Sequence, residues 1–173
     1  MNDLIFIGGV HGVGKGTICR EISKRTNLVH MSASEVLKWG ELSGRKNKRV
    51  ANIQDTQDRL TKGLVEILEK SKSYLMDGHF CLLRPNNSLG KVPMKTFEKI
   101  SPKLIAVATT AVEIIKNRLE KRDEKIYSLD LLEDMQKMEV AYAKEVSISL
   151  KIPFIEIKNG NYTKLIKLIN NLN

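Results

Sequence analysis

The stretch that decides the fold lies near the amino end and reads Leu4-Ile5-Phe6-Ile7-Gly8-Gly9-Val10-His11-Gly12-Val13-Gly14-Lys15-Gly16-Thr17. Its first four residues are all apolar, which predicts a strand buried on both faces. After the glycines, Ile18 and Ile22 stand one helical turn apart and predict a helix. A buried strand, a glycine-rich turn and a helix in this order predict a loop that binds phosphate through its backbone N–H groups.

Each residue type in this loop has a physical reason to be there. Glycines let successive N–H groups converge on an anion, and a lysine reaches the β- and γ-phosphates as a cation. The general pattern places Ser or Thr directly after the lysine, whereas here Gly16 stands there and Thr17 follows. A strand-to-helix turn with an incidental lysine is the alternative that this placement disfavours. The candidate ATP-binding residues are Gly12, Val13, Gly14, Lys15, Gly16 and Thr17.

Four further short apolar runs alternate with helical patterns along the chain. The runs are residues 28–31, 74–76, 104–108 and 154–157. Alternation of this kind predicts an α/β fold with a five-stranded parallel sheet and helices on both faces, with ligands at the carboxyl ends of the strands. The 173 residues fit a single domain, since domains most often have roughly 100–200 residues.

Local signals predict where some helices begin and where a loop is exposed. Ser32-Ala33-Ser34-Glu35 and Thr110-Ala111-Val112-Glu113 have the spacing of capping boxes, in which the first residue caps the helix. Residues 84–93 hold two prolines, two asparagines and a glycine, which predicts an exposed loop.

Composition limits the class of protein. Lys and Arg number 29 against 20 Asp and Glu, so the formal net charge is +9 and anionic partners are favoured. The two cysteines form no spaced pair and the three histidines are scattered, which predicts neither a disulfide framework nor a metal site built on cysteine or histidine. No apolar run reaches the length of a membrane span, so we expect a cytoplasmic protein without membrane contact.

With the glycine-rich loop in place, the chain resembles the archaeal-type adenylate kinases among the small P-loop nucleotide kinases. The resemblance covers nearly the whole length, and the form Gly12-Val13-Gly14-Lys15-Gly16-Thr17 is its most specific part. It implies a single P-loop kinase domain over residues 1–173, an acceptor arm at about residues 32–70 and a short lid at about residues 118–130. It also implies that ATP and Mg²⁺ are used and that the acceptor is a nucleoside monophosphate, with AMP first.

The resemblance assigns roles to residues outside the loop. Asp77 ends the third predicted strand, where it would organise Mg²⁺, although an Asp before Gly78 also suits an ordinary turn. Arg118 and Arg122 stand four residues apart on one side of a helix, as a phosphate lid or as a solvated face. The implied catalytic residues are Lys15, Asp77, Arg118 and Arg122, the implied acceptor-binding residues are Ser32, Ser34, Lys38, His79 and Arg84, and the implied Mg²⁺ ligands are Thr17 and Asp77.

Other functions stay open at this point. The basic run Arg45, Lys46, Lys48 and Arg49 suits an acceptor phosphate or an RNA backbone, although such runs are usually solvated surface. A P-loop kinase acting on another small metabolite or on an RNA 5′-hydroxyl is one alternative, because related P-loop kinases can resemble one another in sequence and still act on different substrates. A nucleotide-switched, RNA-associated assembly factor is another. The oligomeric state is left open.

Overall fold

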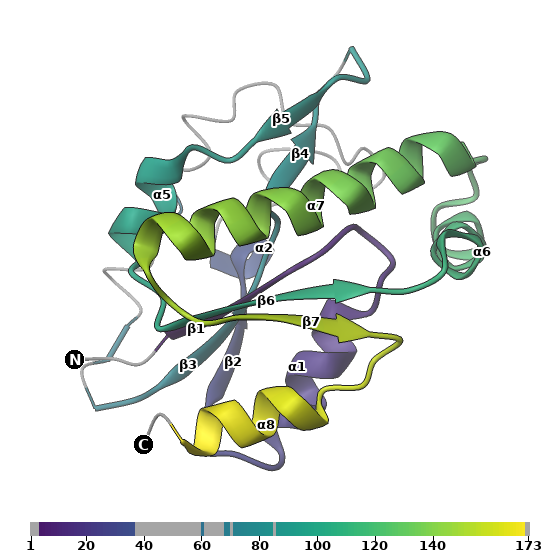
Figure 1. The fold of residues 1–173 in the computed structure, drawn as a ribbon. Helices are drawn as coiled ribbons and strands as arrows, with labels where there is room; N and C mark the ends of the chain where they lie inside the picture. Colours follow the sequence, from purple (N-terminus) through teal and green to yellow (C-terminus); the bar gives the residue numbers. More distant parts are fainter. Residues whose placement is uncertain (1–3, 37–59, 61–67, 70, 85, 172–173) are drawn as a thin grey trace.

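A parallel sheet forms the centre of the computed structural model, which describes residues 4–36, 60, 68–69, 71–84 and 86–171. The strand order is β2-β3-β1-β6-β7, and every neighbouring pair is parallel (Figure 1). The predicted fold class and all five predicted strands are confirmed, with their ends placed to within one residue. The strands are β1 (Leu4–Gly8), β2 (Val29–Ser32), β3 (Tyr74–Asp77), β6 (Leu104–Thr109) and β7 (Phe154–Lys158).

Helices cover both faces of this sheet. Figure 1 shows α1 (Lys15–Ser23) and α8 (Thr163–Asn170) on one side, and α5 (Met94–Ile100) and α7 (Leu129–Leu150) on the other. The short α2 (Ala33–Val36) follows β2, and α6 (Val112–Asp123) lies beyond the carboxyl end of β6. The carboxyl edge of the sheet is therefore bordered by α6 and the start of α7.

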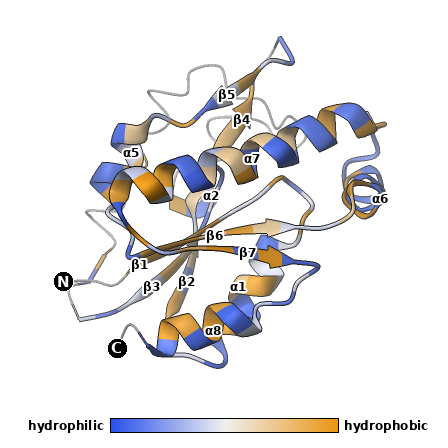
Figure 2. Cartoon of the chain, viewed as in Figure 1, coloured by the Kyte–Doolittle hydropathy of each residue, from blue (hydrophilic) through white to orange (hydrophobic). Residues whose placement is uncertain are grey.

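Alternation along the strands divides the core into two clusters. Leu4 and Phe6 of β1 belong to the cluster under α5 and α7, whereas Ile5 and Ile7 belong to the cluster under α1 and α8. Successive strand residues face opposite sides, so a strand covered on both sides must be apolar throughout. Figure 2 shows the apolar residues of the helices turned toward the sheet and the polar ones turned outward.

The segment after β3 differs from its prediction. Residues 84–93 were expected to form an exposed loop, but β4 (Cys81–Leu83) and β5 (Leu89–Lys91) pair antiparallel as a hairpin. Val92 is buried and its N–H donates to the carbonyl oxygen of Phe80 (2.8 Å). Asn86 and Asn87 lie between the two strands and Pro93 directly precedes α5, so the exposed-loop prediction is wrong for β5.

One predicted helix cap is confirmed and one is wrong. At α2, the Glu35 carboxylate accepts from the Ser32 N–H (2.9 Å) and the Ser32 hydroxyl accepts from the Ser34 N–H (3.2 Å). At α6 the N-cap is Ala111, which has no side-chain cap. The Thr110 hydroxyl instead donates to Asn159 Oδ1 (3.0 Å), a contact that the pairing of β6 with β7 makes possible.

Part of the predicted acceptor arm lies outside the described residues, including Lys38 and the basic run at residues 45–49. Among the residues that the structure describes, no helix has the length and apolar character that a membrane span requires.

Candidate active site

The glycine-rich loop connects β1 to α1 at the carboxyl edge of the sheet. Gly12 and Gly14 have φ angles of 81° and 107°, which side chains with a Cβ rarely adopt. A Cβ on Gly12 would also lie 2.9 Å from Leu119 Cγ of α6. Gly12 is therefore required for two reasons: its backbone has a positive φ angle, and α6 lies too close to leave room for a side chain.

Lys15 begins α1 and folds back over the loop. Its Nζ donates to the carbonyl oxygens of Gly9 (2.6 Å) and Val10 (3.1 Å), and the residue is only 8% exposed. Burial lowers the pKa of this ammonium, while the negative charges of Glu139 and Asp77 act to raise it. The loop therefore already holds a cation where a phosphate group would need one.

The two predicted lid arginines have different partners. Arg118 Nη1 donates to the carbonyl oxygens of Gly12 (3.2 Å) and Val13 (3.1 Å), so it joins α6 to the loop. Arg122 instead forms two hydrogen bonds with Asp123 (2.8 and 2.9 Å), which also raise the pKa of the guanidinium. Tyr127 donates to the same carboxylate (2.6 Å). Arg118 touches the loop, whereas Arg122 has its charge offset by a carboxylate.

Asp77 ends β3 beside the loop and is paired with a histidine from β2. His30 Nε2 lies 2.6 Å from Asp77 Oδ2, and the two side chains are 19% and 13% exposed. Ser32, a predicted acceptor-binding residue, is the strand partner of Asp77. Cys19, His30 and Asp77 form a group that could hold a metal ion. The sequence prediction that the scattered histidines supply no metal site considered only spacing along the chain, and it did not foresee that strand pairing brings His30 beside Asp77.

Glu139 of α7 is another residue at this site that sequence reasoning missed. It is 1% exposed, and its carboxylate accepts hydrogen bonds from the N–H groups of Gly9 (3.1 Å), Phe80 (3.0 Å) and Cys81 (3.2 Å). Burial raises its pKa to about 7, while Lys15 and the three N–H groups act to lower it. This carboxylate fastens the start of the loop to the start of β4.

A signal for Glu139 does exist in the sequence. It stands four residues after Met135 and three before Tyr142, within the stripe of α7 that packs on the sheet. A carboxylate in an apolar stripe must find hydrogen-bond donors, because burial of an unpaired charge is costly.

Two histidines meet above this carboxylate. His79 Nδ1 lies 3.4 Å from Glu139 Oε1, and the ring of His79 lies 4.1 Å from that of His11 between centroids. His11 belongs to the loop and His79 to the segment after β3, so the predicted acceptor-binding histidine lies beside the phosphate loop.

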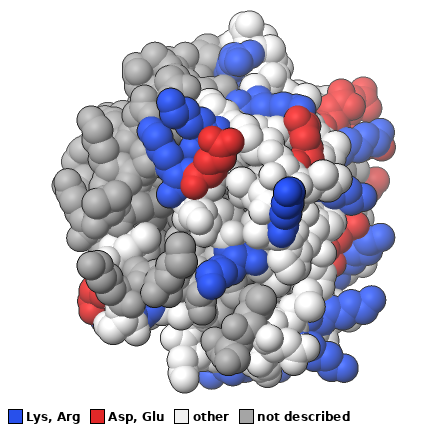
Figure 3. Space-filling model, turned by 60° about the vertical axis from the view of Figure 1, so that its left-hand side comes forward, with Lys and Arg blue, Asp and Glu red and all other residues white. Residues whose placement is uncertain are grey.

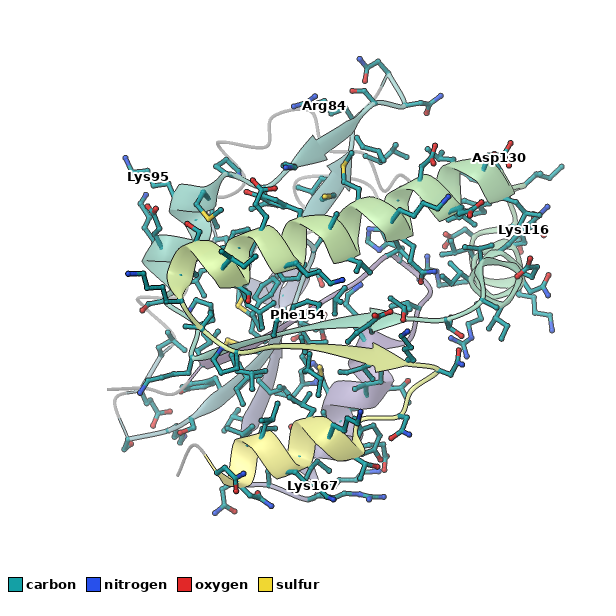
Figure 4. The ribbon with its side chains drawn as sticks, viewed as in Figure 1. Arg84, Lys95, Lys116, Asp130, Phe154 and Lys167 are labelled. Atoms are coloured by element: carbon teal, nitrogen blue, oxygen red, sulfur yellow. The ribbon has the colours of Figure 1, made fainter. Side chains whose placement is uncertain are left out.

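The remaining predicted acceptor residues lie in two places. The hydroxyls of Ser32 and Ser34 are 2.5 Å apart at the start of α2. Arg84 is exposed where the β4–β5 hairpin turns (Figure 4). Its role in acceptor binding stays a prediction, and Lys38 lies outside the described residues.

On the face that Figure 3 turns forward, the described positive charge is not gathered in one place. Figure 3 shows lysine and arginine side chains spread over the face turned forward, with acidic side chains between them. A general attraction for anions follows, and the contacts at the loop must supply any selectivity.

Comparison with protein families decides what kind of chain this is. A family model described as AAA domain matches residues 8–136, from the end of β1 into α7. The chain belongs to this AAA domain family. The matched segment includes the loop, Asp77 and both predicted lid arginines.

Curated relatives of this AAA-domain chain confirm its resemblance to adenylate kinases. It is 31% identical over 121 residues to a putative adenylate kinase of Methanocaldococcus jannaschii, covering 70% of this chain and 59% of that relative. It is 26% identical to the adenylate kinase of Pyrococcus abyssi, covering 99% of this chain and 94% of the relative. The chain is thus an adenylate kinase-like small P-loop kinase.

Solved structures support the same fold. A shikimate kinase from Acinetobacter baumannii superposes with a TM-score of 0.59 at 17% identity, covering 99% of this chain and 93% of that one. A gluconokinase from Sinorhizobium meliloti also superposes with a TM-score of 0.59, at 12% identity, and the match covers 98% of this chain and 95% of that one. At these identities the likeness concerns the fold alone.

Proposed function

We propose that this chain transfers the terminal phosphoryl group of ATP to a nucleoside monophosphate, with AMP as the first acceptor to test. The observation that carries the proposal is the loop itself, held by Lys15, Arg118 and Glu139 at the edge where β2 and β3 end. Relatives named adenylate kinase, aligned over nearly the whole chain, support the choice of acceptor.

In the proposed reaction, catalysis is mainly positioning and electrostatics. The loop N–H groups would receive the phosphate oxygens, and Lys15 would exchange its two carbonyl partners for them. Thr17 and Asp77 would hold Mg²⁺, which neutralises charge on the phosphates. Thr17 is exposed at the start of α1, and its hydroxyl accepts from Arg20 (3.2 Å), so an oxygen ligand is present on that side of the loop.

The acceptor would lie on the side of β2 and β3. Ser32, Ser34 and His79 are the described candidates for contacting its phosphate, with Lys38 and Arg84 as further predicted cations. A phosphate acceptor is already an anion at neutral pH, so its attack on the terminal phosphorus needs no general base.

A hydroxyl acceptor is the second candidate, and one contact favours it. A hydroxyl must lose its proton as it attacks, and Asp77 lies at the strand end with His30 at 2.6 Å. A carboxylate paired with an imidazole is an arrangement that accepts and passes on a proton.

Incubation with a panel of acceptors tests the proposal. Purified protein receives ATP and Mg²⁺ with AMP, CMP, UMP, GMP, a small sugar or RNA bearing a 5′-hydroxyl, and phosphorylated products are separated by chromatography. We expect phosphorylation of a monophosphate, with AMP fastest. Transfer only to a hydroxyl would favour the second candidate. ATP loss that no acceptor accelerates, or that RNA alone stimulates, would contradict both.

Arg118 gives a prediction within this reaction. Arg118→Lys keeps the positive charge but loses the planar donor group that reaches the loop, so we expect kcat to fall by about tenfold to a hundredfold. Steady-state kinetics with saturating ATP would measure it. Lys121→Ala, at an exposed position of the same helix, is the matched control and should retain its rate. Equal kcat values for Arg118→Lys and the wild type would remove Arg118 from the mechanism.

A further inference from the structure

The fold brings together a thiol, an imidazole and a carboxylate from three separate elements. Cys19 stands one helical turn after Lys15 on α1, in the core cluster that contacts the sheet. His30 pairs with Leu75 in the strand register, and Asp77 lies two residues further along β3. Residues two apart on a strand share a face, so His30 and Asp77 project from the same side, the side that α1 covers.

The three groups are close enough to share one ion. His30 Nε2 and Asp77 Oδ2 are 2.6 Å apart, and the ligand atoms of all three residues lie within 4.8 Å of one another. In tetrahedral zinc sites the metal–ligand bonds are roughly 2.0–2.3 Å long, so neighbouring ligand atoms stand about 3.2–3.8 Å apart. Side-chain adjustments of about 1 Å would bring the present group to that geometry.

The types of donor indicate which ion would suit. Thiolate sulfur and imidazole nitrogen are preferred by zinc and its neighbours among the divalent metals, whereas Mg²⁺ takes oxygen ligands. Three protein ligands with a fourth position open to water is the arrangement of non-structural zinc sites. We propose that Cys19, His30 and Asp77 form a binding site for a zinc-type divalent metal ion, distinct in ligand chemistry from a Mg²⁺ site on the phosphate loop.

Charge and burial shape the strength of this site. Cys19 is fully buried, whereas His30 and Asp77 remain 19% and 13% exposed, so the ion would enter from their side. On binding, the Cys19 thiol releases one proton to water and its sulfur takes up the metal. The resulting thiolate and the Asp77 carboxylate together offset the two positive charges. Burial is the largest cause that raises the pKa of this thiol, whereas Lys15 and Arg20 act to lower it.

Occupation of this site would also affect catalysis. Asp77 is the carboxylate that the proposed function assigns to Mg²⁺. When a zinc-type ion binds this carboxylate, it can no longer bind Mg²⁺. Zinc should therefore inhibit phosphoryl transfer reversibly. This consequence rests on the proposed function, whereas metal binding itself does not.

Cobalt(II) is the probe for binding, because a cobalt–thiolate bond gives an intense charge-transfer absorption in the near ultraviolet. The full-length protein is titrated with Co²⁺ under reducing conditions and without nucleotide. We expect this absorption at one ion per chain, and its displacement by Zn²⁺. Absence of a thiolate–cobalt band in folded wild-type protein would overturn the proposal without any variant.

Variants then assign the ligands. Cys19→Ser and His30→Gln should each weaken Co²⁺ binding by at least about tenfold, the loss that even an outer-shell partner can cause. The matched control is Cys81→Ser, because Cys81 is also a buried thiol but packs in the other core cluster. Circular dichroism checks that each variant is folded. A band that survives in Cys19→Ser, or that disappears in Cys81→Ser, would refute this ligand set.

Inhibition is measured separately, with Zn²⁺ added at constant Mg²⁺ and ATP. We expect wild type and Cys81→Ser to be inhibited, and Cys19→Ser to need at least about tenfold more Zn²⁺. Equal inhibition of Cys19→Ser and wild type would overturn the catalytic consequence. If the chain transferred no phosphoryl group, the proposed function would fail while the cobalt spectrum would still decide the metal site.

Discussion

Lys15→Met is expected to reduce phosphoryl transfer by at least about a hundredfold, the scale on which loss of one preorganised donor acts. Methionine keeps much of the length of the lysine stem but removes the ammonium group that now contacts Gly9 and Val10. The phosphates would then lose a cation that is only 8% exposed at the start of α1. Calorimetric ATP binding and kcat/KM would measure the loss.

The control for this change lies on the same helix. Lys24 caps the end of α1, is exposed and pairs with Glu21 (2.7 Å), so Lys24→Met removes an equal charge away from the loop. We expect its kinetics to match those of wild type. Full transfer activity in purified Lys15→Met protein would refute the assigned role of the loop.

Glu139→Gln is expected to change how the stability of the protein depends on pH. The pKa of Glu139 is raised from 4.5 to about 7 in the folded protein, with burial as the largest cause. Between these values the unfolded chain has lost a proton that the folded chain still holds. The contribution of Glu139 to the free energy of unfolding is thus fully present below pH 4.5 and is lost as the pH rises through about 7.

Urea denaturation at several pH values would measure this effect. Relative to Glu139→Gln, wild type should lose stability as the pH rises from 4.5 to about 7. The slope of the difference should approach about 1.4 kcal/mol per pH unit. Lys15 and His79 lie beside Glu139, so the difference includes their interactions with this carboxylate. Above about pH 7 the two curves should become parallel.

Glu145→Gln provides the matched comparison, since Glu145 lies on the same helix but is exposed and pairs with Lys91. Its stability should follow the wild-type pH dependence, because exposed pairs contribute roughly 0–1 kcal/mol. If Glu139→Gln also followed wild type across this range, the buried carboxylate would be ionised throughout, and the raised pKa would be wrong.

The described parts of the fold could be predicted from the sequence where neighbouring residues form a recognisable pattern. The five central strands are apolar at consecutive positions, and the loop glycines stand at fixed spacing, so neighbouring residues suffice to read them. The β4–β5 hairpin and α5 were missed for the opposite reason. Each strand of the hairpin has three residues and α5 has seven, too short for a periodic pattern. They form because Val92 and Phe97 are buried against α7 and the sheet.

The predicted cap at Thr110 shows how a local rule loses to a tertiary contact. The sequence Thr110-Ala111-Val112-Glu113 has the spacing of a capping box, yet the Thr110 hydroxyl donates to Asn159. Forty-nine residues separate these two in sequence, and only the pairing of β6 with β7 brings them together.

The sequence by itself determined that the chain is a parallel α/β protein with a phosphate loop between its first strand and first helix. Runs of consecutive apolar residues and glycine spacing act over a few residues, and no distant partner is needed to recognise them. Only the tertiary structure decided that Glu139 joins Gly9 to Phe80, and that His30 and Cys19 stand beside Asp77. Buried polar groups take their partners from whichever elements pack around them, and in this chain those elements are far apart in sequence.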